Sequence, residues 1–478
     1  MQLLLLGMAA ALFLYDDLFA GSGVRDAVSA EAEPATGFLW WAGFADDPRL
    51  WLPTMVTAKL VVFIAFAWRC RLTRSRLGKP SGFKGLAAID RYFLALPFVL
   101  LALFVADLAC GWLTLVRDVV GDRVLLDEAI AMTPTLLTVL GVWWLHYPID
   151  RRLREATIMR RADEGLPVYP LLSRGRFVFN QARHQLGILL VPLLILMAWS
   201  ESVQWFAETG RITATAALWI TPIGAGTMFV LAPPLLTRVF DTVPLPAGSI
   251  RDAMLEVCAQ HRVRVADLRL WRTGGHMINA AVMGLVPRLR YVLLSDGLLD
   301  QLHRPHVEAV MAHELGHVKH RHIVWLLMFA ALLMGSSFAA ADAVIARTSD
   351  AAWVQSLCIG VALLAWAWAF GWCSRRIERQ ADTFAAKHMS AVGGDEERFT
   401  PEGVSHVAAA LGRVAELNHL RPTRPSWRHG SIAQRQDYLM SLVDRPQKQA
   451  SVDRTMNRLK AAALAAVVTL VALNFWVG

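Results

Sequence analysis

Charged residues are scarce in this sequence of 478 residues. They make up only 18% of it, whereas an ordinary soluble protein is nearer a quarter charged. Hydrophobic residues make up 55%, the mean hydropathy is +0.40, and the apolar residues are concentrated in long runs. The composition therefore argues against a soluble globular protein and predicts a chain that crosses a membrane several times.

Cysteine is also sparse, and its pattern excludes two kinds of site. The chain has 5 cysteines, an odd number, and no two of them have CxxC spacing. A disulfide framework and a cysteine zinc knot are therefore not expected, and we interpret the cysteines as small core residues. The sequence also has no internal repeat and no long low-complexity tract.

About nine apolar segments are long enough to span a bilayer. Their approximate limits are 1–20, 51–68, 92–116, 129–147, 186–206, 213–236, 323–345, 352–373 and 460–477. The first of these segments has no basic region before it and no convincing cleavage site. We therefore expect it to be an uncleaved span and not a signal peptide.

The charges between the apolar segments predict their orientation. Loops 69–91 and 150–183 are rich in arginine and lysine, whereas segment 21–50 is acidic. Positively charged loops stay in the cytoplasm, so loops 69–91 and 150–183 are expected there. If the spans alternate from a cytoplasmic N-terminus, the basic segments 237–322 and 374–459 lie in the cytoplasm as well. The net charge of +9 follows this topology, so no nucleic-acid partner is expected.

The predicted fold is mainly α: a polytopic transmembrane helical bundle with a small α+β catalytic domain at the membrane face. Its five parts are an N-terminal transmembrane region of about six spans, a first catalytic segment, a transmembrane hairpin, a second catalytic segment and a C-terminal span. Their limits are 1–236, 237–322, 323–373, 374–459 and 460–477.

The first catalytic segment has a readable order of elements. We expect a helix at Ser249–His261 and strands at Leu268–Trp271, Met277–Met283 and Tyr291–Leu294. Pro305 suits the first turn of a further helix, which could run straight into the next span.

The sequence His313-Glu-Leu-Gly-His317 indicates a metal site. Two histidines four residues apart share one face of a helix and can converge on one zinc ion. Glu314 lies beside the first histidine, where it could take a proton from the attacking water and pass it to the leaving amine. The alternative is a helix with two incidental histidines.

A catalytic zinc ion needs a third protein ligand. His320 is roughly 10 Å along the helix from His313, too far for the same ion. We interpret His320, Arg321 and His322 as interfacial cations at the cytoplasmic end of the next span. Glu378 is the better candidate, because the predicted hairpin returns the chain to the same face. Asp382, one turn later, could orient a zinc histidine. The alternative for both acidic residues is a solvated helix face paired with arginines.

Four segments resemble the membrane-embedded CAAX prenyl protease family and its bacterial HtpX-like relatives. The first contains the HExxH motif, the second is similar to the family's downstream ExxAD stretch, the third to its edge-strand block and the fourth to a late element with histidine and arginine. The segments are Glu308–His317, Ser374–Asp382, His276–Leu299 and His429–Arg435.

The resemblance implies a zinc-dependent endopeptidase with a gluzincin-type domain. One Zn²⁺ per chain would be held by the two histidines of the motif and Glu378, with the glutamate of the motif as general base. Asn279 and Ala280 would hold the substrate backbone by β-augmentation. His429 and Arg435 would contact the substrate or the developing oxyanion.

Two substrate classes stay open, damaged membrane proteins and the tails of lipidated proteins. The expected setting is a lipid bilayer, with the bacterial relatives implying an inner membrane and the loop charges an active site facing the cytoplasm. The alternative function is a membrane transporter or scaffold with a degenerate zinc site. Lys59, Asp107 and Glu201 could then mark an ion path, or could serve in snorkelling and interhelical hydrogen bonds.

Overall fold

The computed structural model describes most of the chain. The described residues are 1–13, 48–77, 81–123, 125–163, 165, 167–275, 277–347, 352–418 and 420–477. The acidic segment 21–50, apart from its last three residues, and His276 lie outside them, as does the second part of the expected span 1–20. The chain divides into two compact units, Met1–Phe240 and Asp241–Gly478.

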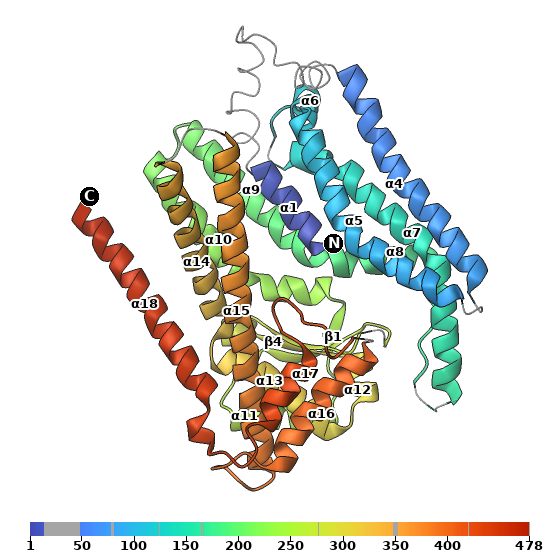
Figure 1. Cartoon of the computed structure of the whole chain (residues 1–478), viewed down its shortest axis with the longest axis vertical. Helices are drawn as coiled ribbons and strands as arrows, with labels where there is room; N and C mark the ends of the chain where they lie inside the picture. Colours follow the sequence, from blue (N-terminus) through green and yellow to red (C-terminus); the bar gives the residue numbers. More distant parts are fainter. Residues whose placement is uncertain are drawn as a thin grey trace. The chain divides into compact units, whose positions relative to one another are not determined.

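The first unit is built of helices. They are α1 (Gln2–Phe13), α4 (Pro48–Arg76), α5 (Ser81–Ala109), α6 (Trp112–Val120), α7 (Leu126–Asp163), α8 (Arg174–Ala182), the π-helix η2 (Arg183–Gly187), α9 (Ile188–Glu208) and α10 (Ala214–Val239). Helix α4 packs against α5 and α7 (Figure 1), and large side chains such as Phe66, Leu100, Phe104 and Trp143 form their common core.

Six helices of the described residues are long and apolar enough to cross a membrane. They are Pro48–Arg76, Lys84–Ala109, Leu126–Asp163, Arg174–Glu208, Ala214–Val239 and His322–Ile345. The expected span 92–116 is interrupted after Ala109, because Gly111 adopts a left-handed φ of 87°. The apolar segments 352–373 and 460–477 lie within helices α15 and α18 of the second unit.

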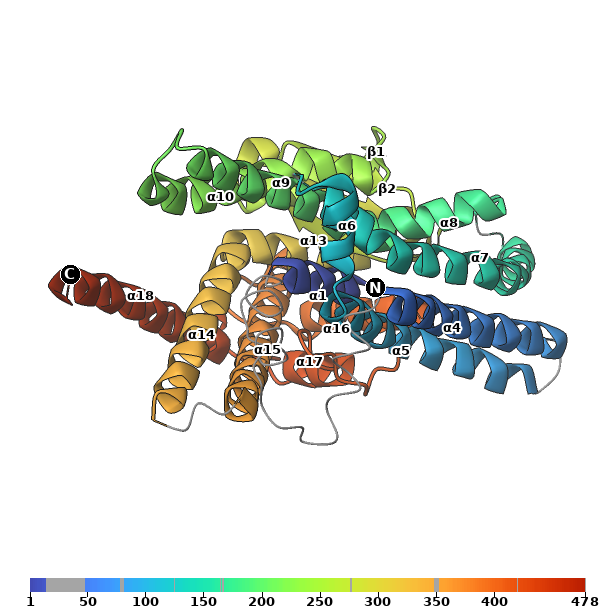
Figure 2. The same cartoon turned by 90° about the horizontal axis from the view of Figure 1, so that it is seen from above.

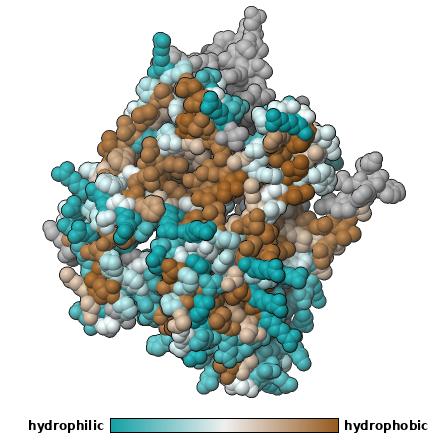
Figure 3. All heavy atoms as spheres, turned by 180° about the vertical axis from the view of Figure 1, so that it is seen from behind, coloured by the Kyte–Doolittle hydropathy of each residue, from teal (hydrophilic) through white to brown (hydrophobic). Residues whose placement is uncertain are grey.

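Large hydrophobic side chains are exposed on these helices. Examples are Ile64 and Trp68 of α4, Phe98 of α5 and Trp219 of α10. Figure 3 shows broad hydrophobic areas on one face of the molecule. Exposed apolar surface of this extent on long apolar helices is what lipid contact requires.

The charged residues considered for an ion path have partners within the first unit. Lys59 of α4 forms an ion pair with Asp107 of α5. Glu201 of α9 accepts a hydrogen bond of 2.7 Å from the backbone of Leu125. Both contacts hold neighbouring parts of the helical bundle together.

The second unit contains a four-stranded sheet in the order β1-β2-β4-β3. The strands are β1 (Thr242–Pro244), β2 (Asp267–Trp271), β3 (Ala280–Met283) and β4 (Tyr291–Ser295). Strands β2 and β4 are parallel, and the other two pairs are antiparallel. The three predicted strands are therefore present. The second of them, which is β3, begins at Ala280 instead of Met277, because Asp296 accepts hydrogen bonds from the backbone of Gly274 and Gly275 and holds the preceding chain in a turn.

Helices surround this sheet and extend from it. They are α11 (Ser249–Gln260), α12 (Asp296–Gln301), α13 (Arg304–Lys319), α14 (His322–Ile345), α15 (Ala352–Val392), α16 (Pro401–Leu417), α17 (Ile432–Met440) and α18 (Ser451–Val477). Helices α14 and α15 run side by side as a hairpin (Figures 1 and 2), and α13 packs against α15 and α16.

Helix α13 does not run straight into α14. It ends at Lys319, and Arg321 has a left-handed φ of 55° before α14 begins at His322. Helix α15, in contrast, continues without a break from its apolar segment to Val392. The chain is therefore bent where α13 enters the hairpin and straight where α15 leaves it.

Candidate metal centre

Helix α13 is held between the sheet and α15. Val307, Met311 and Leu315 are buried in the core that includes the sheet. Gly316 lies on the side facing α15, where an added Cβ would be 3.2 Å from the Cα of Ala381. A Cβ at this distance is tighter than ordinary packing, so glycine favours the close approach of the two helices. This approach brings the acidic residues of α15 to the histidines of α13.

Three side chains from these helices converge. Nε2 of His313 lies 3.2 Å from Nε2 of His317 and 3.7 Å from Oε2 of Glu378, and Nε2 of His317 lies 4.0 Å from Oε1 of Glu378. Ligand atoms about 2.1 Å from one tetrahedral zinc ion lie about 3.4 Å apart. The separations and the donor set of two imidazoles and one carboxylate therefore fit a zinc ion.

The second ring nitrogen of His313 is held by a carboxylate. Its Nδ1 lies 2.9 Å from Oδ1 of Asp382. Asp382 is the residue that the sequence suggests could orient a zinc histidine. Burial alone would lower the pKa of His313, but the hydrogen bond and charge of Asp382 raise it. In a neutral His313 the proton is on Nδ1, so the lone pair of Nε2 points toward the other two ligand atoms.

Arg435 of α17 is buried beside Asp382. Its Nε donates to Oδ2 at 2.8 Å and its Nη2 to Oδ1 at 2.6 Å, so the two side chains form a bidentate pair. Burial would raise the pKa of the Asp382 carboxyl, but the charge and hydrogen bonds of Arg435 keep it below its usual range. The sequence predicts a substrate contact for Arg435; in the structure its guanidinium is bound to carboxylates.

His429 and Arg435 also contact Glu378. Nδ1 of His429 lies 2.9 Å from Oε1 of Glu378, and Nη1 of Arg435 lies 3.5 Å from Oε2. Burial acts to raise the pKa of Glu378, yet the hydrogen bond from His429 and the charge of Arg435 lower it overall. Glu378 is therefore ionised, as a carboxylate ligand must be, and the solvated helix face considered as its alternative is wrong.

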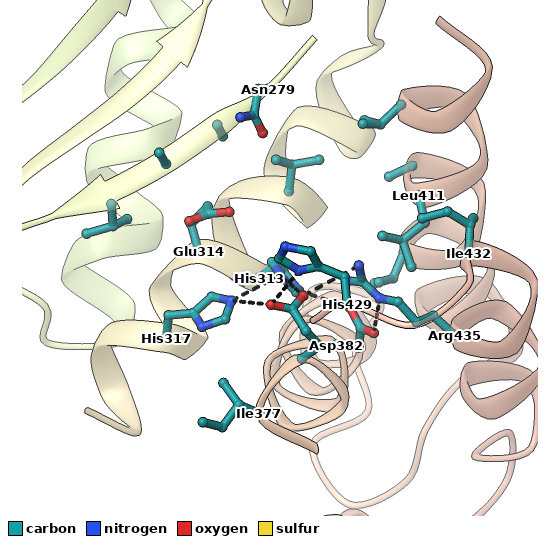
Figure 4. Close-up of a pocket in the computed structure, with 18 of the residues that line it drawn as sticks. Asn279, His313, Glu314, His317, Ile377, Asp382, Leu411, His429, Ile432 and Arg435 are labelled. Atoms are coloured by element: carbon teal, nitrogen blue, oxygen red, sulfur yellow. Dashed lines mark hydrogen bonds and ion pairs between the residues drawn. The ribbon is translucent and has the colours of Figure 1, made fainter. Parts of the chain in front are cut away.

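Glu314 points from α13 toward strand β3 (Figure 4), where the backbone of Val282 favours its charged form. Burial raises the pKa of Glu314 to about 7. A carboxyl group with a pKa near neutrality can both accept and return a proton at physiological pH.

Strand β3 is the edge of the sheet on the side of Glu314. Ser295 donates to the carbonyl of Asn279 at 3.0 Å, so these two residues form a hydrogen-bonded pair. Antiparallel ladders alternate, and the backbone groups of Ala280 and Val282 therefore point away from β4. Asn279 and Ala280 both line the cavity at this edge.

A cavity of about 450 Å³ joins these elements. The strand β3, the three candidate ligands, Glu314, His429 and Arg435 all line it, and apolar side chains of α16 form a further wall, among them Val407, Leu411 and Val414. The structure thus brings together every site residue predicted from the sequence, while their roles stay predictions.

The interpretation of His322 as an interfacial cation is wrong. Its side chain is 2% exposed and lies between His317 and Gln380. His320 stacks on His322, and burial lowers its pKa to about 4, so it is uncharged as well. The bend at Arg321 brings His322 against His317 and His320 against His322. The sequence shows only two histidines near the motif and does not indicate these contacts.

Comparison with known proteins identifies one family match. Residues 247–402 match peptidase family M48, whereas curated protein sequences give no match. Similar solved structures include the crystal structure of S. mikatae Ste24p, with 15% sequence identity over 80% of this chain and 97% of that chain and a TM-score of 0.46. Residues 247–402 thus match a peptidase family, and six helices of the described residues are long and apolar enough to cross a membrane, which together support a membrane peptidase.

Proposed function

We propose that the protein is a zinc-dependent endopeptidase that cleaves membrane or lipidated proteins. The observation that carries the proposal is the triangle of His313, His317 and Glu378, whose edges of 3.2, 3.7 and 4.0 Å match a tetrahedral zinc site, with Glu314 beside it. A zinc ion held by these residues would act as a Lewis acid, polarising the scissile carbonyl and making a water molecule a stronger acid.

Strand β3 positions the substrate in this proposal. An extended peptide pairs with the outward backbone groups of Ala280 and adds a strand to the sheet. At Val282 the backbone of the open edge faces the carboxylate of Glu314. The pairing therefore stops beside the Glu314 carboxylate, and the scissile bond lies over it.

Glu314 carries the proton. Its pKa of about 7 lets it accept a proton from the attacking water and donate it to the leaving amine. His429, whose side chain is half exposed, donates from Nδ1 to Glu378, and in its doubly protonated form it also presents Nε2–H as a hydrogen-bond donor to the developing oxyanion. Arg435 supports this arrangement by holding both Glu378 and Asp382.

The experiment compares purified wild type with Glu314→Gln. We expect about one zinc ion per chain in both proteins and a fall in cleavage of orders of magnitude in the variant. Glu416→Gln, which changes an exposed glutamate of α16, serves as the control with unchanged cleavage. Equal cleavage by the wild type and Glu314→Gln would refute the proposal.

Two substrates separate the open classes. One is an unfolded membrane protein and the other a prenylated peptide with a CAAX tail. Cleavage of the first alone assigns quality control, and cleavage of the second alone assigns processing of lipidated tails.

The proposed location is a bacterial inner membrane with the site facing the cytoplasm. Its support is the arginine-rich composition of loops 69–91 and 150–183. A cysteine introduced at exposed Arg152 should be shielded from a membrane-impermeant thiol reagent in intact cells and react after lysis. Labelling in intact cells would contradict the orientation.

A further inference from the structure

The buried histidine His322 lies against one of the proposed zinc ligands. Its Nδ1 is 2.9 Å from Nδ1 of His317, and its Nε2 is 3.0 Å from Oε1 of Gln380. Gln380 in turn donates through Nε2 to Oδ1 of Asp453, at 2.8 Å. These four side chains, here called the His317–Asp453 chain, connect the metal site with the beginning of α18.

The acidic end determines the direction of every hydrogen bond in the chain. A carboxylate only accepts hydrogen bonds, so Gln380 turns its NH₂ group to Asp453 and its carbonyl to His322. Nε2 of His322 therefore carries the proton. Because a neutral imidazole has a single N–H, Nδ1 of His322 is an acceptor, and the donor facing it is Nδ1–H of His317.

The consequence for His317 is a lone pair on Nε2. That atom faces Nε2 of His313 at 3.2 Å and Glu378 at 4.0 Å. Asp382 fixes the same tautomer in His313 through its contact of 2.9 Å. The two histidines thus receive equivalent support from different partners, one from a carboxylate directly and the other through a neutral imidazole.

The bend between α13 and α14 makes this contact possible. On a continuous helix, His322 would be rotated about 140° around the axis from His317 and would face elsewhere. The left-handed φ of 55° at Arg321 turns the chain back, and the ring centroids of the two histidines come to 4.9 Å. A non-glycine residue keeps this conformation only where the surrounding contacts require it.

We propose that His322 is a positioning residue of the metal site, which fixes the tautomer and ring orientation of His317 and is itself held by Gln380 and Asp453. The inference rests on the proposed function, because it assigns a partner to a zinc ligand. Partners of metal-binding histidines typically contribute 10–100-fold to metal affinity.

The test measures zinc affinity in proteins that also carry Glu314→Gln, so that catalysis plays no part. Competition with a chromophoric chelator should show about 10–100-fold weaker binding for His322→Leu. His306→Leu removes an imidazole from α13 that does not line the cavity, and its affinity should equal that of the parent. The visible absorption bands of the cobalt-substituted protein should shift in His322→Leu alone.

Two further variants separate positioning from folding. His322→Asn places an amide oxygen near the position of Nδ1, so its affinity should recover toward that of the parent. If His322→Leu does not fold, Gln380→Met tests the same chain, because it removes the acceptor for Nε2 with little change in volume. We expect weaker zinc binding and a shifted cobalt spectrum for it as well.

The failure of this inference differs from the failure of the proposed function. Zinc affinity and cobalt spectra equal to those of the parent, in folded His322→Leu or Gln380→Met, overturn the role of His322 alone. A wild-type protein that binds no zinc overturns the proposed function and this inference with it.

Discussion

Replacing Asp382 with asparagine should destabilise the second unit strongly. The Asp382 carboxylate is fully buried, accepts hydrogen bonds from Nε and Nη2 of Arg435 at 2.8 and 2.6 Å, and has Oδ1 2.9 Å from Nδ1 of His313. The asparagine amide can keep its oxygen at the Oδ1 position, but its NH₂ group then faces the Nε–H of Arg435. One charge-assisted hydrogen bond is lost, and a buried guanidinium loses its main counter-ion.

The magnitude follows from this geometry. Removing one partner of a buried ion pair costs about 3–5 kcal/mol. For a unit of this length, 1 kcal/mol corresponds to about 2–4 °C in the unfolding temperature, so the expected decrease is roughly 6–20 °C. Because Asp382 also orients His313, zinc affinity should fall about 10–100-fold.

Tryptophan fluorescence of the detergent-solubilised protein, recorded during heating, measures the unfolding temperature. Asp437→Asn is the matched control, since Asp437 is exposed on the same helix as Arg435 and an exposed change of this kind alters stability by less than about 0.5 kcal/mol. Equal unfolding temperatures for the two variants would show that the buried pair does not stabilise the unit.

Two other substitutions test the close packing and the edge strand. Gly316→Val should destabilise the protein by at least about 1–3 kcal/mol, because its side chain would collide with Ala381 and Phe384 of α15; an unfolding temperature equal to that of the wild type would contradict the close approach. Ala280→Pro removes an outward N–H without disturbing the pairing of β3 with β4 and should raise KM about 2–10-fold at unchanged zinc content. An unchanged KM would exclude pairing at this edge.

The site was predictable where its geometry is local. The spacing of His313 and His317 requires only one helical turn, and Pro305 marks where that helix begins. Glu378 followed from topology, because a hairpin of two spans must return the chain to the same face. In the structure Oε2 of Glu378, on α15, lies 3.7 Å from Nε2 of His313, while its role as a ligand stays a prediction.

The rest depends on contacts between residues far apart in the sequence. Arg435 was expected to touch the substrate, and nothing in its neighbourhood indicates that it pairs with Asp382, 53 residues earlier. His322 was misinterpreted because a continuous helix turns it away from His317. The left-handed conformation of Arg321 that reverses this result has no sequence signature, since the usual residue for it is glycine.

The sequence predicts that segment 352–373 spans the bilayer, and the unbroken course of α15 would then give the bilayer an influence on the geometry of the candidate metal centre. Glu378 lies 16 residues beyond the middle of the apolar segment 352–373, about 24 Å along a straight helix. A change of about 5° in the tilt of this helix, of the kind that hydrophobic mismatch produces, would displace the carboxylate by about 2 Å. Catalytic groups tolerate about 0.5 Å. The thickness of the host membrane should therefore set how well the third ligand meets the two histidines, and activity should be greatest in lipids of one acyl-chain length.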